Sequence, residues 1–209
     1  MRRNKLKIAA FFGFTVIIVF LALNVFSKRE IKNINSKGES VICFGDSITF
    51  GYGVGPGEDY PTSLRKLLSN SVVINAGVDG DTSVEGVNRI QADVLDKNPR
   101  LVLIEFTGND FLKKVPMAAT IRNIRKMIED IQSQGAMAAV VDVSAGLFLI
   151  EYRLRLFILA RQTNSIFIPE VLKGILTNPS MKSDFMHPNK NGYEIVAKKV
   201  YLGIRGYLK

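Results

Sequence analysis

Five short runs of apolar residues constrain the fold of this chain more than any other feature. They lie at 41–44, 72–76, 101–106, 138–143 and 166–168. Runs of this length with little polar alternation are typical of strands buried on both faces of a sheet. Segments between them show helical spacing of apolar residues, most clearly Ile121, Ile124, Ile128 and Ile131. This alternation predicts an α/β fold, a three-layer α/β/α sandwich built on a parallel sheet.

A longer apolar segment precedes these runs. Residues 8–27 are 20 residues without a charge, and a helix rising about 1.5 Å per residue would span the roughly 30 Å hydrocarbon layer of a bilayer. Four basic residues before it favour a cytoplasmic N-terminus: Arg2, Arg3, Lys5 and Lys7. No convincing small-x-small cleavage site follows. We therefore expect residues 1–27 to be an uncleaved signal anchor with one transmembrane helix; the alternative is a cleaved signal and a secreted protein.

Residues 28–39 are polar and aperiodic, which predicts a linker from the anchor to a domain at 40–209. The formal charge of +9 lies mostly at this end, because residues 1–39 contain eight Lys or Arg and two Glu. Such a distribution suits contact with anionic lipid headgroups and argues against a nucleic-acid partner. The chain has one cysteine and one histidine, which excludes an internal disulfide and leaves no cluster for a metal ion.

Polar motifs stand beside the predicted strands. They are GDS at 45–47, GVDGDT at 77–82, TGND at 107–110 and, before the last predicted helix, SDFMHPN at 183–189. The carboxyl ends of parallel strands share one edge of a sheet, so these motifs are expected to meet there. Each motif alone has a simpler reading, since Ser47 or Asn109 could only cap a helix.

Taken together, the motifs contain the groups needed for acyl transfer. Ser47 is the predicted nucleophile and His187 the base that removes its proton, while Asp184, three residues upstream, would orient the imidazole. The backbone N–H groups of Ser47 and Gly80 and the side-chain amide of Asn109 would form an oxyanion hole.

These blocks, GDSIT at 45–49, NAGVDGDTS at 75–83, GND at 108–110 and DFMHPN at 184–189, resemble those of the SGNH, or GDSL, hydrolase family. The similarity covers the region from residue 40 onward and is closest to the bacterial thioesterase, lysophospholipase and arylesterase branch. It implies a flavodoxin-like five-stranded sheet in the order 2-1-3-4-5, the same triad and oxyanion hole, and no cofactor. The anchor at residues 8–27 departs from the many relatives that are cleaved and soluble.

The sequence therefore predicts a serine esterase acting on carboxylic esters or thioesters, with a lipid-derived or short-chain acyl group. The anchor would hold it in the bacterial inner membrane, with the domain on the periplasmic or extracellular side. An envelope polysaccharide deacetylase and a catalytically silent glycan- or lipid-binding module are the alternatives. Within LFLIEYRLRLFILA at 147–160, expected to be a mainly buried helix, Phe148 and Leu149 are the candidates for substrate contact.

Overall fold

The computed structural model of the protein describes residues 30–69 and 71–208. The predicted transmembrane helix at 8–27 and the start of the predicted linker lie outside the described residues. Within those two ranges, no helix combines the length and the apolar character that a membrane crossing requires.

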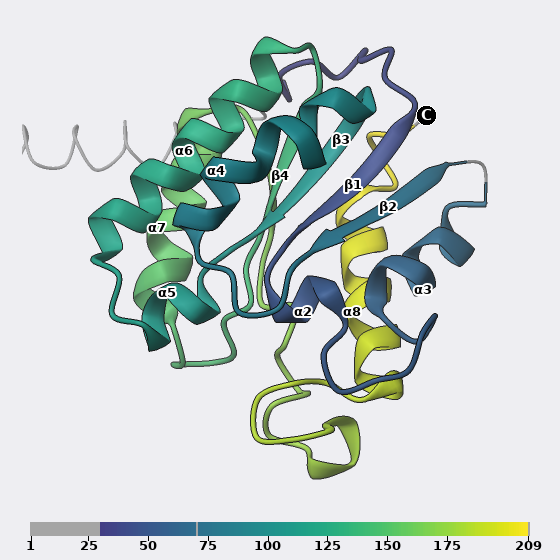
Figure 1. The fold of residues 1–209 in the computed structure, drawn as a ribbon, viewed down its shortest axis with the longest axis vertical. Helices are drawn as coiled ribbons and strands as arrows, with labels where there is room; N and C mark the ends of the chain where they lie inside the picture. The colour runs from purple at the N-terminus through teal and green to yellow at the C-terminus, as the bar shows by residue number, and fades with distance from the viewer. Residues whose placement is uncertain (1–29, 70, 209) are drawn as a thin grey trace, which may run out of the picture. The chain divides into compact units, whose positions relative to one another are not determined.

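The core of the domain is a five-stranded parallel sheet in the order β2-β1-β3-β4-β5 (Figure 1). The strands are β1 (Ser40–Gly45), β2 (Val72–Gly77), β3 (Pro99–Glu105), β4 (Met137–Val141) and β5 (Ile166–Ile168). All five runs predicted from the sequence form strands, and the predicted sheet order is confirmed. β1 lies between two neighbours and is buried over its full length, which explains its lack of polar alternation.

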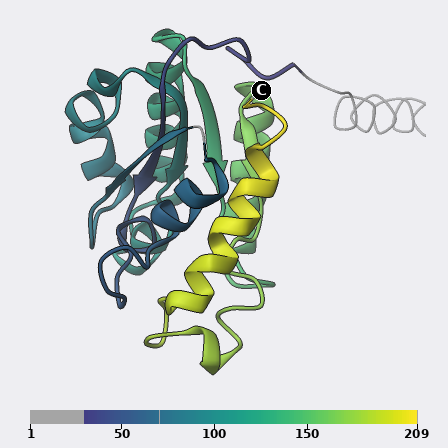
Figure 2. The same cartoon turned by 90° about the vertical axis from the view of Figure 1, so that its right-hand side faces the viewer.

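Helices cover both faces of the sheet (Figures 1 and 2). One face carries α4 (Ser83–Asp93), α6 (Met117–Ser133) and α7 (Ile150–Gln162), and the other carries α3 (Tyr60–Leu67) and α8 (Lys190–Ile204). Alternate residues of β1 supply both cores, with Ile42 and Phe44 on the first face and Val41 and Cys43 on the second. The predicted three-layer sandwich is thus confirmed.

Several short elements and boundaries differ from the expectation. Two short helices, α2 (Ser47–Phe50) and α5 (Gly108–Leu112), follow β1 and β3, and two 3-10 turns complete the described chain, η1 (Leu95–Lys97) and η2 (Pro179–Met181). The helix expected from residue 147 begins at Ile150, because Ala145 and Phe148 pair in a tight turn and Leu149 has a φ of 58°. A left-handed residue cannot continue a right-handed helix.

Residues 31–39 belong to the folded domain, although the sequence predicts a linker over 28–39. Ile31 and Ile34 pack against the core beneath α3 and α8. The Asn33 side chain donates to the carbonyl oxygens of Gln132 and Ala136, at 2.8 and 2.9 Å. The compact unit accordingly begins at Ile31 rather than at Ser40.

Two paired glycines let α2 cross the ends of β1 and β2. Gly45 and Gly77 are partners in the sheet register. A Cβ on Gly45 would lie 2.3 Å from Thr49 Oγ1, and a Cβ on Gly77 would lie 2.2 Å from the backbone nitrogen of Phe50. Both positions therefore exclude any side chain, and Ser47 is held just beyond the end of β1.

Arg89 on α4 joins the ends of β1 and β2 to the turn that follows β2. Its guanidinium donates to the carbonyl oxygens of Gly45 at 3.0 Å and Ala76 at 2.8 Å, and to the Asp81 carboxylate at 2.6 Å. The same group lies over the Phe44 ring, 4.4 Å from its centroid. A planar fork with five N–H donors can make these contacts at once, whereas a lysine could not.

Replacing Arg89 tests this junction. Arg89→Met would leave two carbonyl oxygens and the mostly buried Asp81 carboxylate without their donor, and we expect the free energy of unfolding to fall by about 2–4 kcal/mol. Urea denaturation measures the change. Arg122→Met, at an exposed position on α6, is the matched control and should stay within about 0.5 kcal/mol of the wild type. A wild-type midpoint for Arg89→Met would contradict the role of Arg89.

Candidate active site

Ser47 is fixed by the first turn of α2. Asp46 caps this helix, because its Oδ1 accepts the Ile48 N–H at 3.0 Å. The Ser47 carbonyl oxygen accepts the N–H groups of Gly51 and Tyr52, both at 3.0 Å. These bonds fix the backbone of Ser47, which is 7% exposed and lines a pocket.

Asp184 and His187 lie on a loop between η2 and α8. Asp184 Oδ1 accepts the backbone N–H groups of Met186 at 2.7 Å and His187 at 2.8 Å, and Oδ2 lies 2.7 Å from His187 Nδ1. Partial burial opposes ionisation, but these donors outweigh it and hold the pKa of Asp184 below its usual range. The loop thus presents an ionised carboxylate to the imidazole.

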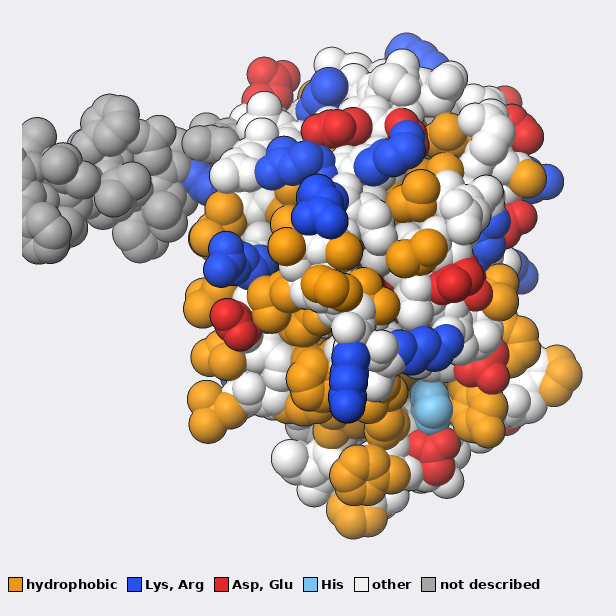
Figure 3. All heavy atoms as spheres, turned by 60° about the vertical axis from the view of Figure 1, so that its left-hand side comes forward, with side chains coloured by type: hydrophobic (Ala, Val, Ile, Leu, Met, Phe, Trp, Pro, Cys, Tyr) orange, Lys and Arg blue, Asp and Glu red, His pale blue; other side chains and the backbone are white. Residues whose placement is uncertain are grey.

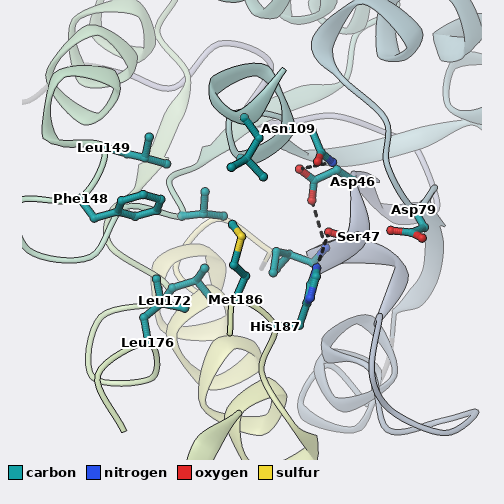
Figure 4. Close-up of a pocket in the computed structure, with 14 residues that line it drawn as sticks. Asp46, Ser47, Asp79, Asn109, Phe148, Leu149, Leu172, Leu176, Met186 and His187 are labelled. Atoms are coloured by element: carbon teal, nitrogen blue, oxygen red, sulfur yellow. Dashed lines mark hydrogen bonds between the residues drawn. The ribbon is translucent and has the colours of Figure 1, made fainter. Parts of the chain in front are cut away.

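The imidazole reaches across the molecule to Ser47. His187 Nε2 lies 3.0 Å from Ser47 Oγ, although the two residues are 140 positions apart (Figure 4). The Tyr52 ring packs beside the imidazole, with 4.5 Å between the centroids. When Nδ1 donates to Asp184, Nε2 is left as an acceptor for the serine proton. The three residues predicted from the sequence therefore form one hydrogen-bonded chain.

The predicted oxyanion donors differ in their position relative to the pocket. Asn109 lies beside Ser47 at the pocket, where its amide donates to the Asp81 carbonyl oxygen at 3.0 Å and to Asp46 Oδ2 at 3.4 Å. Gly80 has a φ of 80°, a conformation that favours glycine. Among the described residues that line the pocket, Asp79 comes from the same turn, but Gly80 is not one of them.

Asp110, next to Asn109, serves the scaffold. Its Oδ2 accepts the Ser83 N–H at 2.7 Å, and its Oδ1 accepts the hydroxyls of Ser83 and Thr120, both at 2.6 Å. These bonds tie α5 to the first turns of α4 and α6. Asn109 is thereby held in position by its buried neighbour.

The pocket beside Ser47 has a volume of about 120 Å³. One side carries Ser47, Asn109 and His187, and the other side is apolar (Figure 4). The apolar side chains that line the pocket are Ile48, Leu112, Val143, Phe148, Leu149, Leu172, Leu176 and Met186. Phe148 and Leu149, predicted from the sequence, are among them.

Three other lining residues were not predicted from the sequence. Leu172 and Leu176 were missed because the segment after β5 has no regular spacing of apolar residues. Met186 lies inside the DFMHPN block and could have been noticed there.

Comparison with known proteins places the chain in a family. The model of the GDSL-like lipase/acylhydrolase family matches residues 43–195. The chain belongs to this family. It is a serine hydrolase of the GDSL, or SGNH, type, and the membership predicted from the four sequence blocks is confirmed.

Relatives of this GDSL hydrolase have esterase and thioesterase names. It is 26% identical over 166 residues to thioesterase 1/protease 1/lysophospholipase L1 of Escherichia coli, covering 76% of this chain and 80% of the relative. It is 27% identical to an arylesterase of Vibrio mimicus, covering 88% of this chain and 93% of the relative. The crystal structure of TesA shares the fold, with a TM-score of 0.76 and 24% identity, covering 81% of this chain and 99% of TesA.

Two buried acids lie beneath Ser47 of this GDSL hydrolase. Glu105, at the end of β3, is 1% exposed and Asp46 is 2% exposed. Glu105 Oε2 accepts the Thr49 hydroxyl at 3.0 Å, while Oε1 receives no hydrogen bond from the described residues. A proton on Glu105 would let it donate to the Asp46 carboxylate.

Burial and this pairing shift both acids. Burial, and then the neighbouring charge of Asp46, raise the pKa of Glu105 well above its usual range. Burial also raises the pKa of Asp46 to about 6, opposed in part by the hydrogen bond from the Ile48 N–H. Both shifts favour a proton on the pair, and we expect Glu105 to carry it. A lone acidic residue in the run LVLIEF was the only sign of this pair in the sequence.

The raised pKa of Glu105 predicts how the stability of the protein depends on pH. As pH rises above the unfolded pKa of about 4.3, unfolded Glu105 loses its proton while folded Glu105 keeps it, so wild-type stability falls until pH passes the folded pKa. Glu105→Gln keeps a donor and an acceptor but has no proton to lose. Its stability relative to the wild type should rise between pH 5 and 8, by at most about 1.4 kcal/mol per pH unit. Urea denaturation across this range measures it.

The control for Glu105→Gln is Glu129→Gln, which removes the same group from an exposed position on α6. Its stability difference from the wild type should change little over the same pH range. Parallel pH curves for Glu105→Gln and the wild type would show that Glu105 is ionised in the folded protein.

Proposed function

We propose that this GDSL hydrolase is an esterase that cleaves carboxylic esters or thioesters through an acyl-enzyme on Ser47. The proposal rests on one observation above all, the 3.0 Å contact between His187 Nε2 and Ser47 Oγ beside a largely apolar pocket. In this reading Ser47, His187 and Asp184 are the catalytic triad.

Acylation begins when Ser47 Oγ attacks the carbonyl carbon of the substrate. The serine proton passes to His187 Nε2, and the ionised Asp184 stabilises the resulting imidazolium through its 2.7 Å bond to Nδ1. His187 then returns the proton to the departing alcohol or thiol. Water, activated by the same imidazole, later attacks the acyl-enzyme and releases the acid.

The tetrahedral intermediates need donors for their oxyanion. The backbone N–H groups of Ser47 and Gly80 and the Asn109 amide supply them in this proposal. The Asn109 amide donates to Asp46 Oδ2 over a long distance of 3.4 Å, so this N–H can turn to the oxyanion instead. The shorter bond to the Asp81 carbonyl oxygen, at 3.0 Å, keeps the side chain in place. Removal of one such donor typically lowers the rate by about 10²–10³-fold.

The pocket favours an acyl group over a sugar. Its far wall is apolar, with Leu149, Leu172 and Met186 facing the Ser47 side, and apolar walls gain free energy when they cover hydrocarbon. A cavity of about 150 Å³ can hold benzene, so a pocket of about 120 Å³ suits a short acyl group or the first carbons of a longer one. The thioesterase, lysophospholipase and arylesterase names of the relatives agree with this substrate class.

Ester hydrolysis by single-site variants tests the mechanism. With a chromogenic acetyl ester, Ser47→Ala should lose at least about 10³-fold in kcat/KM, because the nucleophile is gone. Ser133→Ala, at an exposed position on α6, should keep the wild-type rate. Equal rates for Ser47→Ala and the wild type would remove the proposed mechanism. A panel of ester chain lengths, thioesters and acetylated sugars then compares the acyl substrates with the deacetylase alternative.

We also propose that residues 8–27 anchor the protein in the inner membrane of a bacterium. The support is their length, their lack of charge and the basic residues before them. The intact chain should therefore sediment with membranes after a high-salt wash, as followed by immunoblotting. A soluble product shortened by about the first 27 residues would instead indicate the cleaved signal of the secreted alternative.

A further inference from the structure

The outward face of α7 is apolar where a surface helix is normally polar. Ile150, Leu154 and Ile158 follow one another at intervals of four residues and are 37%, 55% and 50% exposed. The opposite side of the helix, including Leu156 and Leu159, is buried against the sheet. Core packing accounts for the buried side only, and a contiguous exposed apolar stripe marks an interaction site.

This stripe continues to the mouth of the active-site pocket. Leu147 and Phe148, just before α7, are 85% and 38% exposed. Phe111 of α5 meets the Phe148 ring edge-on at 5.9 Å, and Phe148 and Leu112 line the pocket. The α7 surface is defined here by these side chains: Phe111, Leu112, Leu147, Phe148, Ile150, Leu154 and Ile158. Figure 3 shows hydrophobic side chains gathered across the middle and lower part of this side of the molecule, with the histidine at their margin.

Basic residues accompany the α7 surface. Lys113 and Lys114 follow Leu112, Arg155 follows Leu154, and all three are exposed. Arg125 of α6 reaches the last residue of α7, Gln162, at 2.5 Å. Figure 3 shows Lys and Arg side chains, together with some Asp and Glu side chains, among and around the hydrophobic ones. An apolar face with a basic fringe is complementary to a bilayer that contains anionic lipids.

The path of the chain agrees with such a partner. Lys32 donates its N–H to the Asn164 carbonyl oxygen at 2.9 Å, two residues beyond the end of α7. The chain that follows the apolar segment 8–27 thus joins the domain at one end of α7, and the pocket lies at the other end. The 13 residues of α7 span about 20 Å at about 1.5 Å per residue.

We propose that the α7 surface docks on anionic bilayers, with Leu154 and Ile158 in the interfacial layer and the pocket opening toward the lipid. This inference goes beyond the proposed esterase function, because docking requires no chemistry at Ser47. A second copy of the chain is a poorer occupant. A two-fold contact centred on the middle of α7 would bring Arg155 of one copy close to Arg155 of the other, and like charges held close together oppose association.

Vesicle binding by the domain from residue 30 onward tests the proposal. This part can be studied alone, because it contains all five strands and both cores, and because four fifths of this chain covers 99% of the TesA crystal structure. The wild-type domain should sediment with phosphatidylglycerol vesicles, more weakly at high salt, and little with phosphatidylcholine vesicles. Equal binding to both lipids, or none to phosphatidylglycerol, would overturn the proposal.

Substitutions on two faces locate the contact. Leu154→Ser with Ile158→Ser should weaken binding to phosphatidylglycerol at least about fivefold, because two interfacial apolar side chains are lost. Leu67→Ser with Leu202→Ser is the matched control on the α3 and α8 face, where these leucines are 43% and 51% exposed, and it should bind like the wild type. Equal weakening by both pairs would overturn the assignment to α7.

Two further measurements separate the possible explanations. Hydrolysis of a water-soluble acetyl ester should be unchanged in the Leu154 and Ile158 double variant, which shows that it is folded. If the wild-type domain is a dimer by light scattering and this variant is a monomer, the surface is a contact between copies and the lipid proposal is wrong. If neither the wild-type domain nor any variant hydrolyses esters, but the wild-type domain still binds vesicles, the proposed function is wrong and the docking surface stands.

Discussion

The arrangement of this GDSL hydrolase depends on how closely the backbone packs at the carboxyl end of β1. Gly45 and Gly77 leave no room for a Cβ between the sheet and α2, so the helix lies directly on the strand ends. Arg89 then binds the carbonyl oxygens that emerge there. Ser47 receives its position from these contacts, and the loops that meet it are arranged around a fixed point.

Buried acids support this fixed point from below. Asp46 caps α2, and a proton on Glu105 would allow the two carboxyl groups to lie together without two charges. Asp110 ties α5, and with it Asn109, to neighbouring helices. Each acid satisfies backbone or hydroxyl donors that would otherwise be buried without partners, and such groups are costly. The same residues that stabilise the fold therefore hold the proposed reacting groups in place.

Much of this fold and site could be predicted from the sequence, for a physical reason. A buried strand such as β1 is local and nearly all apolar, and parallel topology brings the strand ends to one edge. Ser47 and Asn109 could therefore be grouped before their contacts were known, and the resemblance of the DFMHPN block to the SGNH family added Asp184 and His187. Their mutual distances depend on loop paths, and these came only from the structure.

Other features depend on packing that no local pattern records. Leu172 and Leu176 reach the pocket from an irregular segment. The raised pKa of Glu105 depends on its burial and on the charge of Asp46, 59 positions away. The apolar helix at 147–160 was expected to be mainly core, because its sequence is apolar on both sides and gives no direction of burial. The structure separates the two sides, with Leu156 in the core and Leu154 outside it.

The position of His187 has a consequence for the order in which heating disrupts the protein. Its loop lies outside the sheet, the Asp184 side chain is 42% exposed, and neighbouring Phe185 is 87% exposed. Surface loops outside the sheet open locally at a smaller free-energy cost than the whole domain. Heat would thus separate His187 from Ser47 before the strands come apart. A warmed sample could keep its full circular dichroism signal and still turn over no substrate.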